Sequence, residues 1–295
     1  MIDVTGLKRW GGLAGAPDGA GVTIAGIPYD GSAVYRKGAA QAPDRIRSLS
    51  AVMPPVTEEG NLLAGLSVRD IGDIGAGSSI EEEWPRVADR LAEIPAQSIL
   101  TVLGGDHCTA IATLAAQARR HPGLSVLWMD AHPDLCEFSR GGRWTCGCAL
   151  RRALEVSGIP PEQVVIVGGR DYDPEELDFI REKGVTLVGA RELASTPETA
   201  LMTVQDKLAG RDVHISFDID SLDPAFAPGT EIPSPGGLTT RQALEVLHSV
   251  ARVARLVGLD IVEISPPFDS GNITTLAALK VIFEFWGLAR SNIPK

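Results

Sequence analysis

Short apolar runs alternate with helical patterns along nearly the whole of this 295-residue sequence. The apolar runs typical of buried strands begin at Val22, Ser98, Leu124, Gln163, Val185, Val213 and Leu256. Helical patterns lie between them, for example at residues 80–94, 109–120, 174–183, 240–250 and 275–286. Strands that are apolar along their whole length are typical of a parallel sheet with helices on both faces. The alternation therefore predicts an α/β fold.

The spacing of glycine and proline favours a single domain that spans residues 1–295. A chain of this length can bury its core as one large domain or as two smaller ones. Glycine and proline are scattered as turn residues, with one loop-like concentration at residues 223–237. Neither an internal repeat nor a linker divides the sequence, so we expect one domain.

The net charge of −11, with 22% charged residues, disfavours a polyanionic partner. Nucleic acid and anionic membranes would be repelled except at a local basic patch, and the sequence has no basic run. We find no apolar stretch of about 20 residues able to span a bilayer. The first 12 residues also lack the charged start and apolar middle of a signal peptide. We therefore expect a cytoplasmic protein without nucleic-acid or membrane partners.

The cysteines are four in number and lie close together, at Cys108, Cys136, Cys146 and Cys148. They are too few and too clustered to form a disulfide scaffold in a chain of this size, so we expect reduced thiols. Cys146 and Cys148 form a C-x-C pair, which leaves a zinc site as an alternative. Structural zinc usually has two separated ligand pairs with wider spacing, which disfavours that alternative.

Acids and histidines gather where the predicted strands end. They are Asp106 and His107 in GGDH, Asp130, His132 and Asp134 in MDAHPD, Asp218, Asp220 and Asp223 in SFDIDSLD, and Asp260 and Glu263 in GLDIVE. In an open parallel sheet, ligands bind beyond the carboxyl ends of the strands. Taken singly, such an aspartate usually caps a helix and such a histidine is usually structural. Taken together, so many acids would repel one another unless cations neutralised them.

This ligand set is rich in oxygen and contains two imidazoles, which suits Mn²⁺ better than a structural zinc ion. Ni²⁺ also accepts imidazole and carboxylate ligands, so the residues alone leave it open. Six ligands exceed the needs of one site. With two bridging carboxylates they would hold two ions about 3.5 Å apart, an arrangement that polarises a shared water toward an electrophile.

The motifs GGDH, DAHPD and SFDIDSLDPAFAPGT resemble those of the ureohydrolases, the arginase and agmatinase superfamily. Further matches are GIPYDGSAVYRKGA, PSPGGLT and GLDIVEISPPFD, so the resemblance extends from about residue 26 to the C-terminus. It implies a three-layer α/β/α domain with a mainly parallel eight-stranded sheet. It also implies two Mn²⁺ ions, hydrolysis of a guanidinium or similar amidine group, and assembly as a homotrimer or homohexamer.

The resemblance also implies a role for each residue of the motifs. His107 and Asp134 would bind one ion, His132 and Asp220 the other, and Asp130 and Asp218 would bridge both. Asp134 would also accept a hydrogen bond from the attacking hydroxide and pass its proton to the departing amine. Glu263 matches the family's carboxylate that orients the guanidinium.

One departure from the family pattern occurs at Cys146. Agmatinase-like and arginase-like members usually carry a histidine before the glycine at this point, and that histidine shuttles protons or contacts substrate. Here Cys146 precedes Gly147. The thiol would act as a weak acid or base only if metal ions lowered its pKa. The alternative is a small replacement with no catalytic task.

The segment CEFSRGGRW matches the family's variable specificity region and carries Arg140, Arg143 and Trp144. An arginine there would pair with a substrate carboxylate, which would favour a guanidino acid or formimino amino acid over agmatine. A solvated arginine is the alternative. Trp144 would either stack on a cationic group or pack in the core.

We therefore predict a binuclear metal hydrolase that cleaves a C–N bond of a linear guanidino or amidine compound and releases urea, as agmatinase does. A guanidino-acid hydrolase and a formiminoglutamase-like enzyme are alternatives. A catalytically weak supporting subunit is another, because the usual histidine is missing. A two-metal phosphoesterase is disfavoured, because basic phosphate-binding groups are lacking and Glu263 would repel an anionic substrate.

Overall fold

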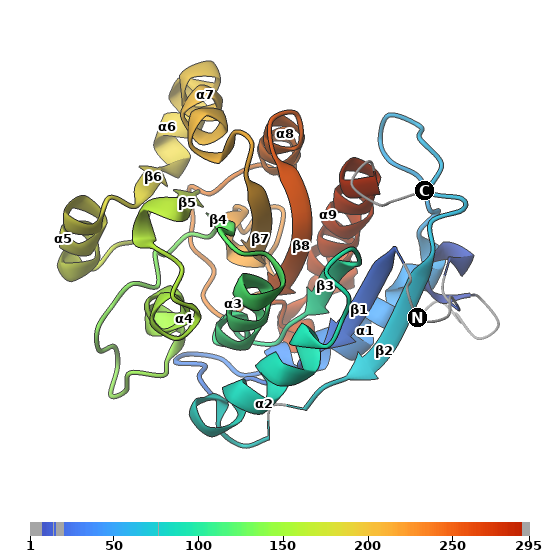
Figure 1. The fold of residues 1–295 in the computed structure, drawn as a ribbon, viewed down its shortest axis with the longest axis horizontal. Helices are drawn as coiled ribbons and strands as arrows, with labels where there is room; N and C mark the ends of the chain where they lie inside the picture. The colour runs from blue at the N-terminus through green and yellow to red at the C-terminus, as the bar shows by residue number, and fades with distance from the viewer. Residues whose placement is uncertain (1–7, 14, 16–20, 76, 291–295) are drawn as a thin grey trace.

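The structure is a computed structural model that describes residues 8–13, 15, 21–75 and 77–290 (Figure 1). One sheet of eight strands runs through this part of the chain in the order β2-β1-β3-β8-β7-β4-β5-β6, and every pairing is parallel. The strands are β1 Val22–Gly26, β2 Val68–Asp73, β3 Ile99–Leu103, β4 Ser125–Met129, β5 Val164–Val167, β6 Thr186–Val188, β7 Asp212–Asp218 and β8 Arg255–Val262. The expected eight-stranded α/β fold is confirmed, with a sheet that is parallel throughout.

Helices cover both faces of the sheet (Figure 1). The first face carries α2 Ile80–Ala92, α3 Thr109–Arg120, α4 Ala149–Ser157 and α5 Pro174–Lys183. The second carries α1 Ala42–Leu49, α6 Ala190–Ser195, α7 Pro197–Leu208, α8 Thr240–Ala251 and α9 Ile273–Ala289. Successive residues of a strand point to opposite faces, so Leu100 and Val102 of β3 pack in the first layer while Ile99 and Leu103 pack in the second. Both faces are buried, which explains why the strands are apolar throughout.

All seven strands expected from the sequence are present, and β2 is the strand that was not expected. Its sequence is VRDIGD, and it lies at an edge of the sheet with most of its residues partly exposed. An edge strand tolerates charged residues that a central strand excludes, so β2 lacks the apolar signature of the others. Helices α1, α4, α6 and α7 are also additional to the examples expected.

Helix α9 corrects the expectation that no segment is long and apolar enough to cross a membrane. The segment Ser270–Ala289 passes that test by length and composition, and 61% of its apolar window is buried inside the molecule. Trp286 is fully buried and donates a hydrogen bond from Nε1 to Thr101 Oγ1 at 2.9 Å. The helix therefore packs against the sheet as a core helix. The expectation about a signal peptide concerns residues that lie largely outside the described part of the chain.

The four central strands, β3, β8, β7 and β4, are neighbours, and all four end at the same edge of the sheet. Between β3 and α3 the chain makes an unusually close turn at Gly105. A Cβ atom on Gly105 would lie 1.7 Å from the carbonyl oxygen of Tyr29, and the N–H of Asp106 donates to that oxygen at 2.7 Å. Only glycine fits this approach, which places His107 over the ends of the strands.

Candidate metal centre and active site

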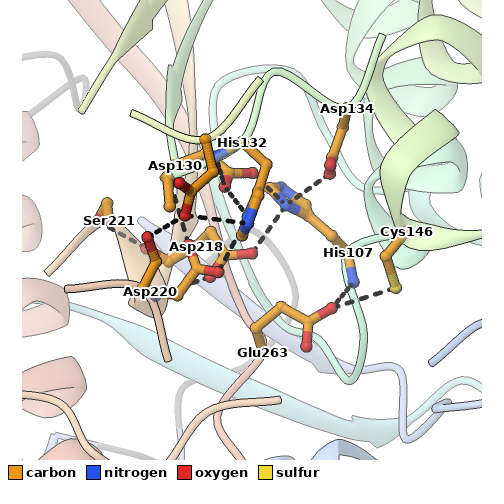
Figure 2. Close-up of polar contacts among 12 residues, drawn as sticks. His107, Asp130, His132, Asp134, Cys146, Asp218, Asp220, Ser221 and Glu263 are labelled. Carbon is orange, nitrogen blue, oxygen red and sulfur yellow. Dashed lines mark hydrogen bonds and ion pairs between the residues drawn. The ribbon is translucent and has the colours of Figure 1, made fainter. Parts of the chain in front are cut away.

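The six predicted ligands meet at this edge of the sheet (Figure 2). They are His107 after β3, Asp130, His132 and Asp134 after β4, Asp218 at the end of β7, and Asp220 in the short helix Ile219–Ser221. Five of them are almost completely buried, whereas the side chain of His132 is 27% exposed. The parallel register therefore brings together residues that are far apart in the sequence.

The imidazole of His107 points one nitrogen at three carboxylates. Its Nδ1 lies 2.9 Å from Asp130 Oδ2, 3.0 Å from Asp218 Oδ2 and 3.4 Å from Asp134 Oδ2. The ring stacks on Trp128 at 3.8 Å between centroids, which fixes its plane. The Nδ1 atom of His107 is buried and has no hydrogen-bond partner. An unpaired nitrogen among carboxylate oxygens is the donor set of a metal ion.

The other nitrogen of His107 explains which atom is free to bind a cation. Ser216 Oγ donates to Asp260 Oδ1 at 2.6 Å, and it lies 3.0 Å from His107 Nε2. Because the serine hydrogen is committed to Asp260, its oxygen accepts the hydrogen of Nε2. The lone pair of Nδ1 is then left for a cation. Such a partner behind a ligating histidine is typical of metal sites.

A second group of ligands surrounds His132. Its Nδ1 lies 3.2 Å from Asp220 Oδ2 and 3.4 Å from Asp130 Oδ1. Asp130 thus turns one oxygen to His107 and the other to His132, as a bridging carboxylate would. Asp218 faces His107 with Oδ2, while its Oδ1 accepts the N–H of Asp220 at 2.7 Å. Asp130 is therefore the carboxylate shared by both groups of potential ligands, whereas Asp218, which the resemblance implied as a second bridge, belongs only to the group around His107.

The electrostatics of the cluster favour added positive charge. Burial raises the pKa of Asp218 well above its usual range, and the charges of Asp220 and Asp130 add to this. Burial alone would lower the pKa of His107, but the carboxylate of Asp130, 2.9 Å from Nδ1, and the surrounding acids outweigh this and raise it to about 9. Protons are therefore held where metal ions would bind, and metal binding would release them. The residues fit a pair of divalent cations.

A cavity of about 330 Å³ opens beside this cluster. Its lining includes His107, His132, Asp134, Asp218 and Asp220. Cys146, Glu231 and Glu263 line one part of its wall, and Arg140, Asp171 and Tyr172 line other parts. The cavity is large enough for a small linear molecule whose reactive group faces the proposed metal ions.

Glu263 turns its carboxylate toward the cavity from the end of β8. Its Oε1 accepts the N–H of His107 at 2.8 Å and lies 3.4 Å from Cys146 Sγ (Figure 2). Its Oε2 is buried and has no hydrogen-bond partner. Glu263 has a φ of 64° and Asp134 a φ of 53°, a left-handed conformation that costs roughly 1–2 kcal/mol for residues other than glycine. Such strain often marks functional residues, because the fold holds them in position.

Cys146 lies between two carboxylates in the short helix Cys146–Cys148. Its Sγ is 3.4 Å from Glu263 Oε1 and 3.8 Å from Glu231 Oε2. A hydrogen bond with Cys108, burial and the charge of Glu263 raise the pKa of Cys146 well above its usual range. The side chain is therefore a neutral thiol, which favours the interpretation without a catalytic task. Cys148 points to the carbonyl of Gly142 instead, so the C-x-C pair does not converge on a zinc site.

The three residues of the variable segment that were predicted to contact substrate have different positions. Arg140 lines the cavity, and no ion pair joins it to another described residue. Arg143 and Trp144 do not line the cavity, which corrects their predicted role. Arg143 forms an ion pair outside the cavity, with its Nη2 2.7 Å from Glu137. Trp144 packs against the apolar layer of the first face.

Other acids at the strand ends have structural roles. Asp106 accepts the N–H groups of Ser32 and Cys108, and Asp223 accepts those of Ala225, Gly236 and Gly237. Asp260 accepts hydrogen bonds from His214 and Ser216. Neither Asp106 nor Asp223 caps a helix, because α3 begins after Cys108 and α8 after Thr239, so both acids instead satisfy backbone N–H groups of loops and turns.

Sequence reasoning missed Glu231, which lies between the motifs APGT and PSPGG. Its side chain is 3% exposed and lines the cavity. The signal that would have found it is a charged residue in a loop otherwise built from glycine, proline and small or apolar residues. Such a loop does not bury a charge without a partner.

Comparison with known proteins agrees with this geometry. The sequence model of the arginase family matches residues 20–287. Proclavaminate amidinohydrolase of Streptomyces clavuligerus is 35% identical over 90% of this chain and 87% of its own. Superposition on its solved structure gives a TM-score of 0.84 and covers 93% of each chain. The mitochondrial guanidino acid hydrolase of Homo sapiens is 32% identical over 91% of this chain and 78% of its own. The agmatinase of Bacillus cereus is 32% identical over 89% of this chain and 90% of its own.

Proposed function

The chain belongs to the arginase family, and from that premise we propose that it cleaves the guanidino group of a small linear compound and releases urea. Membership makes it a metal-dependent hydrolase of guanidino C–N bonds. One observation carries the proposal. The unpaired Nδ1 of His107 and the unpaired Oε2 of Glu263 are both buried beside one cavity, the first suited to a metal ion and the second to a guanidinium.

We assign the metal ions to the two groups of ligands that share Asp130. His107, Asp134 and Asp218 would surround one ion, and His132 and Asp220 the other. When bound, divalent ions supply Lewis acidity that lowers the pKa of water and stabilises developing charge. Mn²⁺ is our first choice because the donors are mainly oxygen, and Ni²⁺ would also accept them.

The protein's own residues then perform three tasks. A guanidinium is planar, cationic and a poor electrophile, so its orientation must be fixed before attack. Glu263 would hold it by accepting charge-assisted hydrogen bonds at Oε2. Asp134 would accept a proton from the attacking water and deliver it to the departing amine. The neutral thiol of Cys146 would donate to Glu263 and keep that carboxylate in place.

Agmatine, whose tail carries a second cation, is the first candidate substrate. Besides the proposed ligands, the cavity wall carries the carboxylates of Glu231, Glu263, Asp171, Asp173 and Glu176 against one arginine. Glu176 and Asp173 are engaged in a capping box, but Asp171 is 57% exposed at the cavity. An acidic wall attracts a dication more strongly than it attracts a zwitterion.

A guanidino acid is the second candidate, and Arg140 favours it. Ser139 and Gly142 pair by reciprocal hydrogen bonds at 3.0 and 3.1 Å, so Arg140 occupies a two-residue turn with a φ of 46°. Glycine or asparagine normally occupies such a position. An arginine at this position of the cavity wall suits a substrate carboxylate. The guanidino acid hydrolase among the similar proteins supports this candidate.

Urea release tests the proposal directly. Purified protein loaded with Mn²⁺ or Ni²⁺ should release urea from at least one of agmatine, arginine, guanidinobutyrate, guanidinopropionate and guanidine. Ammonia release from formiminoglutamate would instead support the formiminoglutamase-like alternative. Homogeneous, metal-loaded protein that releases neither product would contradict the proposal and favour a supporting subunit.

Replacing Arg140 with glycine should separate the two candidate substrates. Glycine suits the positive φ, so the turn should keep its shape while the cation is lost. If a guanidino acid is the substrate, kcat/KM for it should fall about 10- to 100-fold, from loss of a charged contact worth roughly 1.5–3 kcal/mol. Steady-state urea release with Arg143→Ala as control checks this, since Arg143 lies outside the cavity. A preference for guanidino acids that survives Arg140→Gly would exclude Arg140 as the carboxylate partner.

Replacing Cys146 with histidine should lower activity. The imidazole would lie beside the carboxylates of Glu231 and Glu263, whose charges raise its pKa and keep it protonated. It would then compete with the substrate cation for Glu263, and kcat/KM should fall about tenfold or more. Urea release at low and saturating substrate measures the effect. Increased turnover would show instead that only a proton shuttle was missing.

A further inference from the structure

Glu231 places a second buried carboxylate opposite Glu263. It lies in the loop between β7 and α8, and its side chain is 3% exposed. Its Oε2 lies 3.8 Å from Cys146 Sγ, and the same sulfur lies 3.4 Å from Glu263 Oε1. The two glutamates thus flank one neutral thiol at the wall of the cavity.

The two oxygens of Glu231 have different surroundings. Oε1 accepts the N–H groups of Val34 and Tyr35, both at 2.6 Å, and so anchors the loop after β1. Oε2 receives no N–H donor, and its neighbour Cys146 Sγ, 3.8 Å away, has a single hydrogen that is donated to the closer Glu263. A single oxygen therefore satisfies the structural role, which leaves the other for a ligand.

The charge of this pair is not balanced within the described residues that contact it. Arg36 follows Val34 and Tyr35 in the loop, but its guanidinium donates to the backbone oxygens of Thr230 and Glu231. Burial raises the pKa of Glu231, and burial together with the charge of Glu231 raises that of Glu263. Buried acids of like charge are costly unless a cation joins them. The unpartnered Oε2 of Glu263, which is 4% exposed, independently indicates that the cation comes from a ligand.

The two carboxylates are close enough for both to reach one nitrogen of a guanidinium. A ligand atom of Glu231, Cys146 Sγ and a ligand atom of Glu263 all lie within 4.8 Å of one another. The two N–H bonds of a planar NH₂ group diverge by about 120°, and hydrogen bonds of about 2.8 Å along them reach oxygens about 4.8 Å apart. One terminal NH₂ group is thus able to donate to both glutamates.

We propose that Glu231 is a substrate-binding residue that holds a terminal NH₂ group of the guanidinium together with Glu263. The inference rests on the proposed function and narrows it to substrates whose terminal guanidino nitrogen is unsubstituted. It also accounts for product release, because urea is neutral and gains little from two carboxylates. The small thiol of Cys146 leaves room for this second carboxylate.

The Glu231→Gln variant tests the role of Oε2 separately from that of Oε1. The amide oxygen of glutamine would still accept from Val34 and Tyr35, while the charge at Oε2 is lost. We expect KM for the guanidino substrate to rise about tenfold or more with a smaller change in kcat, since a contact made before and during reaction is removed. The melting temperature and the metal content should stay unchanged.

Glu284 on α9 provides a control at a buried glutamate whose charge is balanced by Lys280, 2.6 Å from its Oε1. It is also fully buried, its Oε1 also accepts a backbone N–H, from Glu58, and its Oε2 has no hydrogen-bond partner. It does not line the cavity. Glu284→Gln should leave KM unchanged, whatever it does to stability.

Binding of guanidinium ion, measured by calorimetry at millimolar concentration on the Mn²⁺-loaded protein, provides a test without turnover. Wild type should bind, and Glu231→Gln should bind about tenfold or more weakly. Absence of urea release by wild type would refute the proposed function. The binding measurement would still test the role of Glu231 in that case. Unchanged KM and guanidinium affinity in Glu231→Gln would overturn the inference. Loss of metal from the variant would also overturn it, because the glutamates would then hold an ion.

Discussion

Replacing Asp218 with asparagine is expected to remove metal binding and, with it, urea release. The amide oxygen would keep the hydrogen bond from the N–H of Asp220, which Asp218 Oδ1 now accepts at 2.7 Å. An NH₂ group would then replace Oδ2, the oxygen 3.0 Å from His107 Nδ1. Loss of a partner behind a ligand costs about 10- to 100-fold in metal affinity, so loss of a ligand itself should cost at least about 100-fold.

Metal content after Mn²⁺ loading and dialysis measures this effect, together with the melting temperature with and without Mn²⁺. Wild type should be stabilised by the metal, because a ligand that binds the native state raises stability. Asp218→Asn should lose that increase. Its metal-free form should be no less stable, because the amide keeps the hydrogen bond from Asp220 and replaces one of several crowded buried carboxyl groups.

Asp212→Asn is the control, since it removes a carboxylate from the opposite end of the same strand. Asp212 is paired with Arg255, whose side chain is 50% exposed, and an exposed ion pair contributes about 0–1 kcal/mol. The metal content of Asp212→Asn should match that of wild type. An Asp218→Asn variant that binds manganese as wild type does would contradict the assigned centre.

Replacing Glu263 with glutamine is expected to reduce kcat/KM by about one to two orders of magnitude while leaving metal content unchanged. The amide oxygen would still accept the N–H of His107, so the loop should keep its conformation. The lost interaction is a charge-assisted contact with the guanidinium, worth roughly 1.5–3 kcal/mol. If the contact strengthens during the reaction, kcat should fall as well as 1/KM.

Steady-state urea release from the substrate found in the screen measures this prediction, and Glu284→Gln is again the control because it leaves the cavity intact. Combining Glu263→Gln with Glu231→Gln adds a test of coupling. If both carboxylates hold one NH₂ group, the two losses should not be additive, since neighbouring residues that share a partner are coupled. Wild-type kcat/KM in Glu263→Gln would contradict the role given to this carboxylate.

The central strands of the sheet were predictable because each is buried on both faces and must therefore be apolar throughout. The edge strand β2 was not, since half-exposed positions accept Arg69, Asp70 and Asp73 and hide the pattern. The same limit affects the cavity. Arg140, Arg143 and Trp144 are equivalent candidates in the sequence, but an ion pair with Glu137 draws Arg143 away and the apolar layer takes up Trp144.

The sequence by itself determined the alternation of strands and helices and the placement of acids and histidines after four strands, because both follow from local patterns of residue type. Only the tertiary structure decided that those four strands are neighbours, so that His107, Asp130 and Asp218 lie around one point. It also decided which acids accept hydrogen bonds from backbone N–H groups, as Asp106 does, and which face the cavity, as Glu231 does. The reason is physical: burial and hydrogen-bond partners depend on residues far away in the chain, and these determine whether a buried charge is satisfied or left for a ligand.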